Sequence, residues 1–391
     1  MTTLWIIAFI GAVWWLWQSM CIAKTLRAVR PLPPGRIVPP TESPPLVSVI
    51  CPARDEADAI EAAIRTRLTD TVPWMEFIFV DDRSSDGTGE ILERECEQDA
   101  RARLVRNAEL PAGWLGKVHA QQVGVDHARV REDGWYLFSD GDTHVHPGAV
   151  EAAIAWAEQE QADHVALTPR ITRGTWLLRL CITPLMRVLI CTLRMWLAND
   201  DSQPRAMGVG AFNLVRRAAL ERAGGLSELR LEVADDVGVG RIVKGAGGRS
   251  RTAIGVAWLD IEWYRTAGQF LRGSEKGVAK ARTRLGILRS GLFGVAVICV
   301  DISPFVLLAW LPTPAALLAT ATAAMAVLMS VQVARAFGLS VWWSLLAPLG
   351  AFVALLISFR ALGLGLLRGG VRWRGDTHTL AATTDGERVR L

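Results

Sequence analysis

The chain has 391 residues, of which 51% are hydrophobic and 16 are tryptophan, and its mean hydropathy is +0.25. This composition excludes an ordinary soluble enzyme and directs the search to membrane segments first. The net charge of +4 does not indicate nucleic-acid binding, because the basic residues cluster beside apolar stretches, and six scattered cysteines without a CxxC pair predict reduced, structural thiols.

The N-terminus is predicted to anchor the chain in a membrane. Residues 1–23 contain no charged side chain and are long enough to cross a bilayer. A basic start and a small-residue cleavage site are both missing, so we expect a retained anchor rather than a cleaved signal peptide. Residues 24–45 form a basic, proline-rich linker, whose positive charges place this side of the membrane in the cytoplasm.

The C-terminal region, residues 291–366, is expected to cross the membrane two or three times before a polar tail over residues 367–391. Lysines and arginines precede this region and again indicate the cytoplasmic side. The apolar stretches within it are 291–311, 315–334 and 341–358.

Two features of this region leave alternatives open. Three full spans would place the arginine-rich tail outside the cell. Either the last stretch, which contains Pro348 and Gly350, is re-entrant or interfacial, or the charge rule fails. Asp301 is costly inside an apolar span, and it marks either a functional group or a kink or helix interface.

Residues 46–285 predict a cytoplasmic domain that is large enough to bury a core. Short apolar runs predict buried strands, and residues at helical spacing follow them. This alternation predicts an α/β fold with a mostly parallel, Rossmann-like sheet, in which ligands bind beyond the carboxyl ends of the strands. The predicted strands are 46–51, 77–80, 103–105, 135–138 and 164–168.

Acidic residues follow three of these strands at the predicted binding edge. In the tripeptide Asp140-Gly141-Asp142 two carboxylates lie one residue apart, and like charges so close need a cation or a shared proton. Such oxygen ligands suit Mg²⁺ or Mn²⁺. An acidic surface turn is the alternative for the tripeptide alone, but three acidic loops on one edge favour a site. The other two loops carry Asp55 and Glu56, and Asp81 and Asp82.

Residues 175–199 are very apolar, yet Arg179, Arg187 and Arg194 fall on one helical face. We expect an amphipathic interfacial segment, divided into two helices by Pro184, whose arginines lie near lipid phosphates. The alternative is a core helix whose arginines extend to its surface.

Seven short motifs in order carry a resemblance to a known family. They are PARDEA (52–57), VDDRSSDGT (80–88), GWLGKVHA (113–120), SDGD (139–142), GAFNLVRR (210–217), VADD (233–236) and QFLR (269–272). Together they resemble an inverting family 2 glycosyltransferase of the GT-A fold over residues 45–285. The GWLGK motif and the membrane arrangement most resemble the hopene-associated and carotenoid-type membrane glycosyltransferases.

The resemblance implies a role for each motif. Asp236 aligns with the general base, although an acid heading a helix also serves as a cap. Asp140 and Asp142 match the motif that binds Mg²⁺ or Mn²⁺ at the donor diphosphate. Gly208, Gly210 and Asp235 are assigned to the acceptor side. The donor-binding residues are Pro52, Ala53, Asp55, Glu56, Asp81, Asp82, Lys117, Asp140, Gln269 and Arg272.

The expected function is transfer of one sugar, with inversion, from a UDP- or GDP-sugar to a hydroxyl of an isoprenoid, hopanoid or carotenoid-like lipid. The enzyme is expected to be a multi-pass protein of the inner membrane with its catalytic domain on the cytoplasmic side. Gly273 stands where processive members of the family have a tryptophan, which favours a single addition. A processive polysaccharide synthase and a non-catalytic membrane sensor of nucleotide sugars are the alternatives.

Overall fold

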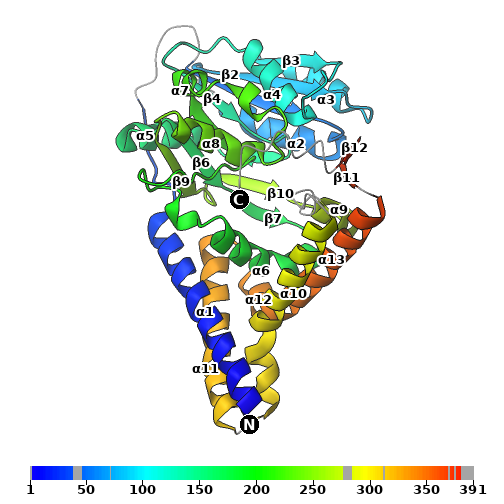
Figure 1. The fold of residues 1–391 in the computed structure, drawn as a ribbon. Coiled ribbons are helices and arrows are strands. Elements are labelled where there is room, and N and C mark those ends of the chain that lie inside the picture. The colour runs from blue at the N-terminus through cyan, green and yellow to red at the C-terminus, as the bar shows by residue number, and fades with distance from the viewer. Residues whose placement is uncertain are drawn as a thin grey trace. The chain divides into compact units, whose positions relative to one another are not determined.

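The computed structural model describes residues 2–37, 46–70, 72–275, 284–310, 313–368, 370–373 and 376–379. The end of the predicted proline-rich linker, the basic stretch at 276–283 and the tail from residue 380 lie outside this description. The chain divides into two compact units (Figure 1). A helical unit comprises residues 1–28, 173–196 and 263–385, and an α/β unit comprises residues 29–172 and 197–262.

The α/β unit is built on a seven-stranded sheet with the strand order β3-β2-β1-β4-β8-β6-β9. Most residues of its central strands are apolar and buried, as expected for strands that are covered on both faces. The strands are β1 (Val47–Ala53), β2 (Met75–Asp82), β3 (Ala102–Asn107), β4 (Trp135–Phe138), β6 (His164–Thr168), β8 (Asn213–Arg216) and β9 (Ser250–Ile254).

Helices cover both faces of this sheet (Figure 1). Successive residues of β1 therefore pack alternately into two different cores. Val49 and Cys51 pack toward one core, with the apolar sides of α2, α3 and α5, whereas Ile50 packs toward a second core with α4, α7 and α8. This period of two is the pattern of a strand buried on both faces. The helices are α2 (Ala57–Leu68), α3 (Thr88–Cys96), α4 (Gly116–Asp126), α5 (Ala149–Glu160), α7 (Arg217–Arg222) and α8 (Asp235–Gly245).

The predicted mostly parallel sheet is confirmed. Strand β1 is parallel to β2 and β4, β2 is parallel to β3, and β6 is parallel to β9. Strand β9 was not predicted, and two further features also escaped prediction. Strand β8 runs antiparallel between β4 and β6, and a second sheet of three short strands has the order β5-β10-β7. These strands are β5 (Thr143–Val145), β10 (Leu259–Glu262) and β7 (Arg170–Arg173).

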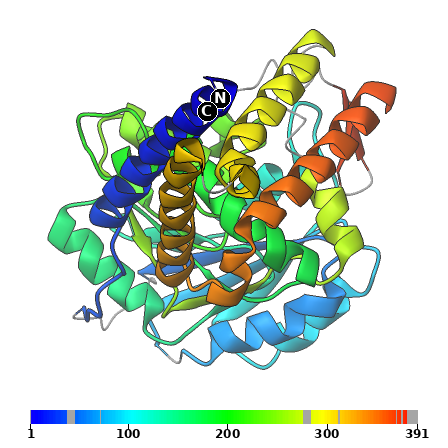
Figure 2. The same ribbon diagram turned by 90° about the horizontal axis from the view of Figure 1, so that it is seen from below.

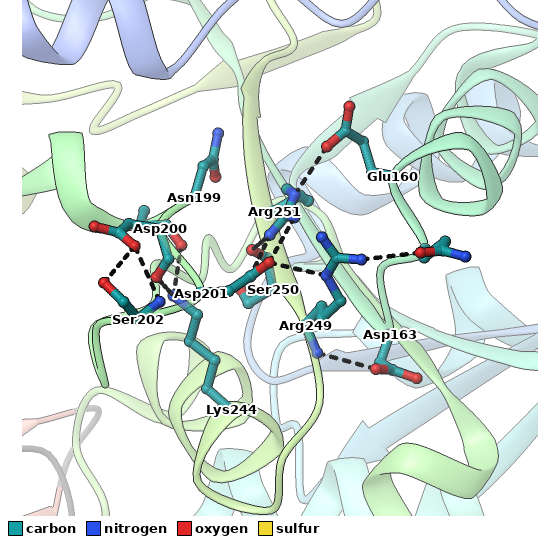
Figure 3. A network of polar contacts seen from close by, with 12 residues as sticks. Glu160, Asp163, Asn199, Asp200, Asp201, Ser202, Lys244, Arg249, Ser250 and Arg251 are labelled. Carbon is teal, nitrogen blue, oxygen red and sulfur yellow. Dashed lines mark hydrogen bonds and ion pairs between the residues drawn. The ribbon is translucent and has the colours of Figure 1, made fainter.

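A polar network holds the segment that begins at residue 198, after α6 (Trp176–Thr192), in place (Figure 3). The Lys244 ammonium of α8 donates to the carbonyls of Ala198, Asp200 and Arg205, at 3.0, 2.7 and 2.8 Å. Arg251 of β9 pairs with Asp201 at 2.7 Å. The segment is thereby tied to both α8 and β9.

The helical unit contains the N-terminal helix and most of the C-terminal third of the chain. Helix α1 packs against α11 and α10, and α10 packs against α13 (Figure 2). The elements are α1 (Thr2–Ala28), α6 (Trp176–Thr192), α9 (Ala267–Gly273), α10 (Arg284–Leu307), α11 (Pro314–Ala336), α12 (Val341–Leu345), α13 (Ala347–Arg368), β11 (Gly370–Trp373) and β12 (Asp376–Thr379).

Four helical segments in the described residues are long and apolar enough to cross a membrane: Thr2–Ala28, Trp176–Leu193, Pro314–Ala336 and Ala347–Leu364. The sequence predicted the first, third and fourth regions, and its further predicted span at residues 291–311 falls on α10 and on the apolar helical segment Gly294–Trp310. The predicted stretch 341–358 is divided at Leu346 into α12 and α13, and Pro348 lies in the first turn of α13, where a missing N–H costs little.

The predicted break at Pro184 is wrong, because α6 is one helix from Trp176 to Thr192. A proline at 184 removes the intrahelical hydrogen bond to the carbonyl of Leu180. Gly350 of α13 packs against that carbonyl, so closely that an added Cβ would lie 2.0 Å from the oxygen. The close contact between α6 and α13 therefore lies at the Leu180 carbonyl, which has no helical hydrogen-bond donor at Pro184.

We predicted that three arginines of residues 175–199 lie near lipid phosphates, and for Arg187 this prediction is wrong. Arg187 is only 2% exposed, and its guanidinium pairs with Asp301 of α10 at 2.9 Å, whereas Arg179 and Arg194 are exposed. The sequence could not reveal this pairing, because the two residues are 114 positions apart. Asp301 is thus part of a buried ion pair between helices.

Candidate active site

The loop after β1 is fastened to the loop after β2. Asp55 accepts hydrogen bonds from the backbone N–H and the hydroxyl of Ser85, at 2.8 and 3.2 Å. The N–H of Glu56 donates to the Thr88 hydroxyl at 2.8 Å. The parallel pairing of β1 with β2 brings these loops to one edge, and Pro52 and Ala53 are the last residues of β1 beside them.

Asp81 and Asp82 end β2 and are both buried. Asp81 accepts from the Ser84 N–H at 3.2 Å. Asp82 forms a two-pronged ion pair with Arg83, at 2.9 and 3.0 Å, and also accepts from the amide of Asn107 at 2.9 Å. These bonds fix the Asp82 carboxylate at the strand end, next to the start of α4.

The acidic loop at residues 139–142 follows β4 and meets the loop after β1. A Cβ on Gly141 would lie 2.1 Å from the Glu56 carboxylate, so that carboxylate rests directly on the glycine. The N–H of Asp140 donates to the Gly210 carbonyl at 2.8 Å. Asp142 is half-buried at the other end of the loop. All three predicted acidic loops therefore lie together.

Lys117, at the start of α4, connects this loop to a second group of acids. Its ammonium lies 2.7 Å from Asp140 and 3.3 Å from Asp235. Burial disfavours the ammonium, but the charges of Asp140, Asp235 and Asp236 outweigh burial and raise the pKa of Lys117. Gln121, one helical turn further on, donates to Asp235 at 3.1 Å. Lys117 therefore stays charged between the two groups.

Asp236 lies at the start of α8 and is only partly exposed. Burial and the neighbouring charge of Asp235 raise the pKa of Asp236 to about 6. The carboxylate accepts from the N–H groups of Gly210, at 3.1 Å, and Val237, at 2.8 Å. The N-cap residue of α8 is Ala234, without a side-chain cap, so these contacts do not give Asp236 the usual capping role.

Gly208 and Gly210 are needed because backbone and carboxylate approach each other closely here. A Cβ on Gly208 would lie 1.6 Å from the Asp236 carbonyl oxygen, and one on Gly210 would lie 2.4 Å from the Asp140 carboxylate. Gly210 bonds in both directions, through its carbonyl to Asp140 and through its N–H to Asp236. A single peptide segment thus joins the predicted metal loop to the predicted base.

Comparison with known proteins agrees with this arrangement. Residues 48–222 match a family model described as "Glycosyl transferase family 2". The match begins in β1 and includes the acidic loop at residues 139–142, called the DGD loop below, and the glycines at 208 and 210. This part of the chain, somewhat less than half of it, is thus similar to glycosyltransferase family 2.

The curated relatives match only part of the domain. Over 122 residues the chain is 36% identical to the uncharacterized glycosyltransferase EpsJ of Bacillus subtilis (strain 168), covering 31% of this chain and 33% of the relative. Over 99 residues it is 42% identical to the putative teichuronic acid biosynthesis glycosyltransferase TuaG of the same organism, covering 25% and 36%. The chain spans about a third of the length of these relatives.

A solved structure extends the likeness in fold. The mannosyltransferase PcManGT from Pyrobaculum calidifontis, in complex with GDP-Man and Mn²⁺, superposes with a TM-score of 0.51 at 19% identity, covering 91% of this chain and 99% of the other. The predicted GT-A fold is confirmed. The narrower resemblance to hopene-associated and carotenoid-type enzymes stays a prediction.

The last two predicted donor-binding residues, Gln269 and Arg272, belong to α9 in the helical unit and are exposed. Gln269 accepts from the N–H of Thr266 at 3.1 Å, and the Thr266 hydroxyl accepts from the N–H of Gln269. This reciprocal pair starts α9. The donor-binding role of both residues remains a prediction.

Three polar residues that support the site were assigned no role from the sequence: Arg67, Gln121 and Asn213, the last of which lies within the motif GAFNLVRR. Asn213 donates to the Asp236 carbonyl at 3.0 Å and is itself held by buried His164. A signal existed for each in the sequence. Arg67 follows Ile60 and Ile64 on the apolar face of its helix, Gln121 lies four residues after Lys117, and Asn213 opens an otherwise apolar strand.

Proposed function

We propose that this protein is a membrane-bound, metal-dependent, inverting glycosyltransferase that moves one sugar from a UDP- or GDP-sugar to a hydroxyl of a lipid. One observation carries the proposal. Gly210 bonds through its two backbone groups to Asp140, in the predicted metal loop, and to Asp236, the predicted base. The two groups that direct displacement requires, a metal-binding loop and a base, are therefore held against the same residue.

The side chains of the DGD loop fit a divalent cation. Asp140 already has the Lys117 ammonium at 2.7 Å, so a positive charge is accommodated there. Within the residues that the structure describes, no group of three or more histidines, cysteines or acids could hold a metal. Mg²⁺ typically uses one or two carboxylates and takes further ligands from phosphate and water. A cation held by Asp140 and Asp142 would thus depend on the donor diphosphate.

The metal, when bound, would neutralise the charge that develops on the departing diphosphate. The structural neighbour's complex with GDP-Man and Mn²⁺ supports the same expectation here. The chain's own residues supply the rest. Lys117 stays positive beside Asp140, where it can contact a phosphate oxygen. Asp82 and its partners shape the edge at which we expect the base and ribose of the donor.

Asp236 is suited to accept the proton of the attacking hydroxyl. A pKa of about 6 leaves the carboxylate deprotonated at neutral pH, and it is more basic than an ordinary aspartate. The Gly210 N–H holds one carboxylate oxygen in place. Because Asp236 acts only as a base and no side chain attacks the sugar, the acceptor hydroxyl displaces the diphosphate directly, and the configuration at the anomeric carbon inverts.

A single addition is favoured over processive synthesis by the surroundings of Gly273. A Cβ at residue 273 would lie 2.2 Å from the Tyr264 hydroxyl oxygen, so the tyrosine fills the space where the tryptophan of processive relatives would begin. Tyr264 also stacks on Trp263, with ring centroids 5.1 Å apart. The name of TuaG points to a polysaccharide, but the match covers only about a third of that protein.

A lipid acceptor and a place at the cytoplasmic face of the inner membrane are supported by the apolar helices of the helical unit. Four of its segments have the length and composition of membrane spans. Exposed Phe9, Leu16, Leu317 and Phe352 on three of them suit contact with acyl chains. An enzyme so anchored meets hydrophobic acceptors at the surface of the bilayer.

The test is a transfer assay with the full-length protein in membranes, using radiolabelled UDP- and GDP-sugars, Mn²⁺ and extracted lipids. We expect a labelled product that partitions into organic solvent, and none with Asp236→Asn. A membrane sensor would bind the donor and transfer nothing even as wild type. An insoluble polymer would identify a processive synthase. Absence of transfer across donors and lipid extracts would contradict the proposal.

A further inference from the structure

Arg67 is a buried arginine whose side chain contacts the DGD loop and not solvent. It lies in the last turn of α2 and is 2% exposed. Its guanidinium donates to the Asp140 carbonyl, to the Ser139 hydroxyl at 3.1 Å and to the Gly141 carbonyl at 3.4 Å. Every hydrogen bond that the structure gives this side chain thus goes to one tripeptide.

The surroundings of Arg67 are unusual for a buried charge. A buried guanidinium is normally paired with a carboxylate, because removing an unpaired charge from water costs several kcal/mol. Within the described residues, no carboxylate oxygen forms an ion pair with Arg67. Its donors meet only neutral oxygens, while the carboxylates of Asp140 and Asp142 belong to the same loop. Ordinary stabilisation of α2 does not require this arrangement.

The contacts of Arg67 extend to the segment that carries Gly210. The Ser139 hydroxyl, which accepts from Arg67, donates in turn to the Ala211 carbonyl at 2.7 Å. The next bond along is that of the Asp140 N–H to the Gly210 carbonyl, at 2.8 Å. Arg67 therefore anchors a short hydrogen-bonded chain that connects the DGD loop to the peptide holding Asp236.

We propose that Arg67 is a positioning residue for the divalent cation. By binding the backbone oxygens of residues 140 and 141 from below, it turns those carbonyls away from the cleft and fixes the loop with the Asp140 and Asp142 carboxylates presented together. This inference rests on the proposed function, because it assumes a metal-bound donor at that loop. Partners that orient metal ligands typically contribute 10- to 100-fold to metal affinity.

The variant Arg67→Lys tests whether the hydrogen bonds of the guanidinium, rather than its positive charge, support cation binding. Lysine keeps the positive charge but cannot span the three oxygens that the guanidinium reaches, so any electrostatic effect on the cation is preserved while the positioning is lost. Arg65→Lys is the matched control. It lies two residues away on the same helix, its side chain is 58% exposed, and it pairs with Glu95 and not with the loop.

The measurement is a titration of the full-length protein in detergent with Mn²⁺ in the presence of GDP or UDP, followed by electron paramagnetic resonance. We expect Arg67→Lys to weaken Mn²⁺ binding by about tenfold or more, and Arg65→Lys to leave it unchanged. Ser139→Ala, which removes one partner of Arg67 without altering a buried charge, should produce a smaller loss in the same direction. It serves as the second test should Arg67→Lys fold poorly.

The outcomes separate the two proposals. If the wild type binds Mn²⁺ and both Arg67→Lys and Ser139→Ala bind it within twofold of wild type, the positioning role is overturned while the proposed function stands. If the wild type binds neither Mn²⁺ nor nucleotide, both fall. A loss of thermal stability without a change in Mn²⁺ affinity would assign Arg67 a structural role only and would also overturn the inference.

Discussion

Two groups of charged side chains, one in each unit, show how similar residues serve different ends. In the α/β unit, Lys117 faces Asp140 and Asp235, and about a third of both the Lys117 and the Asp140 side chain is exposed. In the helical unit, Arg187 faces Asp301, and the two side chains are only 2% and 9% exposed. The first group has more acids than bases and is open to ligands. The second is balanced and closed.

The hydrogen bonds around the two groups deepen the contrast. Asp301 receives Arg187, the amide of Gln18 at 2.8 Å and the indole of Trp14 at 3.2 Å, and Arg187 also lies over the Trp15 ring at 4.4 Å. The acid is thus satisfied by neighbours from α1 and α6. The comparison teaches that a buried pair of opposite charges joins helices, whereas a partly exposed group of charges stays accessible to a ligand.

The largest effect is expected at the base. Asp236→Asn keeps the shape of the side chain but removes its ability to accept a proton, so turnover should fall by about a thousandfold while the donor still binds. The check is a transfer assay alongside a donor-binding titration. Full turnover in the variant would remove Asp236 from the mechanism and weaken the distinction between the groups.

A comparable loss, in stability rather than activity, is expected in the helical unit. Asp301→Asn leaves the Arg187 guanidinium buried without a carboxylate, which should cost about 3 kcal/mol of unfolding free energy. The double variant Asp301→Asn with Arg187→Met should regain most of it. Thermal unfolding in detergent measures both. An unchanged unfolding temperature in the single variant would contradict the account of a closed structural pair.

A smaller effect concerns pH. In the proposed mechanism Asp236 acts as a carboxylate, and its pKa is raised to about 6, so turnover should be half-maximal near pH 6 and reach its plateau at higher pH. The positive charge of Lys117 lowers the pKa of Asp236, so Lys117→Met should move the midpoint to higher pH. Rate profiles at saturating donor give both midpoints. Equal midpoints would show that Lys117 and Asp236 do not interact.

Much of the α/β unit could be predicted because its signals are local. Apolar runs predicted the parallel strands β1, β2, β3, β4 and β6 but not β9, and acidic residues after three of them predicted the edge at which Glu56, Asp82 and Asp140 are found. Strand β8 was missed because only two apolar residues lie between Asn213 and Arg216, and its antiparallel direction depends on distant partners.

Long-range pairing explains the other failures. A helical pattern shows that Arg67 falls on the buried face of α2, but it cannot show which oxygens the side chain meets in a loop 72 residues away. In the same way, the spacing of the arginines in α6 suggested a lipid-facing stripe, yet Arg187 turns inward because Asp301 lies on another helix. Pro184 lies within α6, and Gly350 of α13 packs against the Leu180 carbonyl that the proline leaves without its helical donor, which the sequence of α6 alone could not show.

The most direct test of the central claim is to locate Mn²⁺ by its anomalous scattering in crystals of the full-length protein grown with Mn²⁺ and GDP. The account predicts a single peak about 2 Å from carboxylate oxygens of Asp140 and Asp142, in a cleft that Asp236 also faces. A peak bound elsewhere, or one in a cavity separated from Asp236, would contradict it.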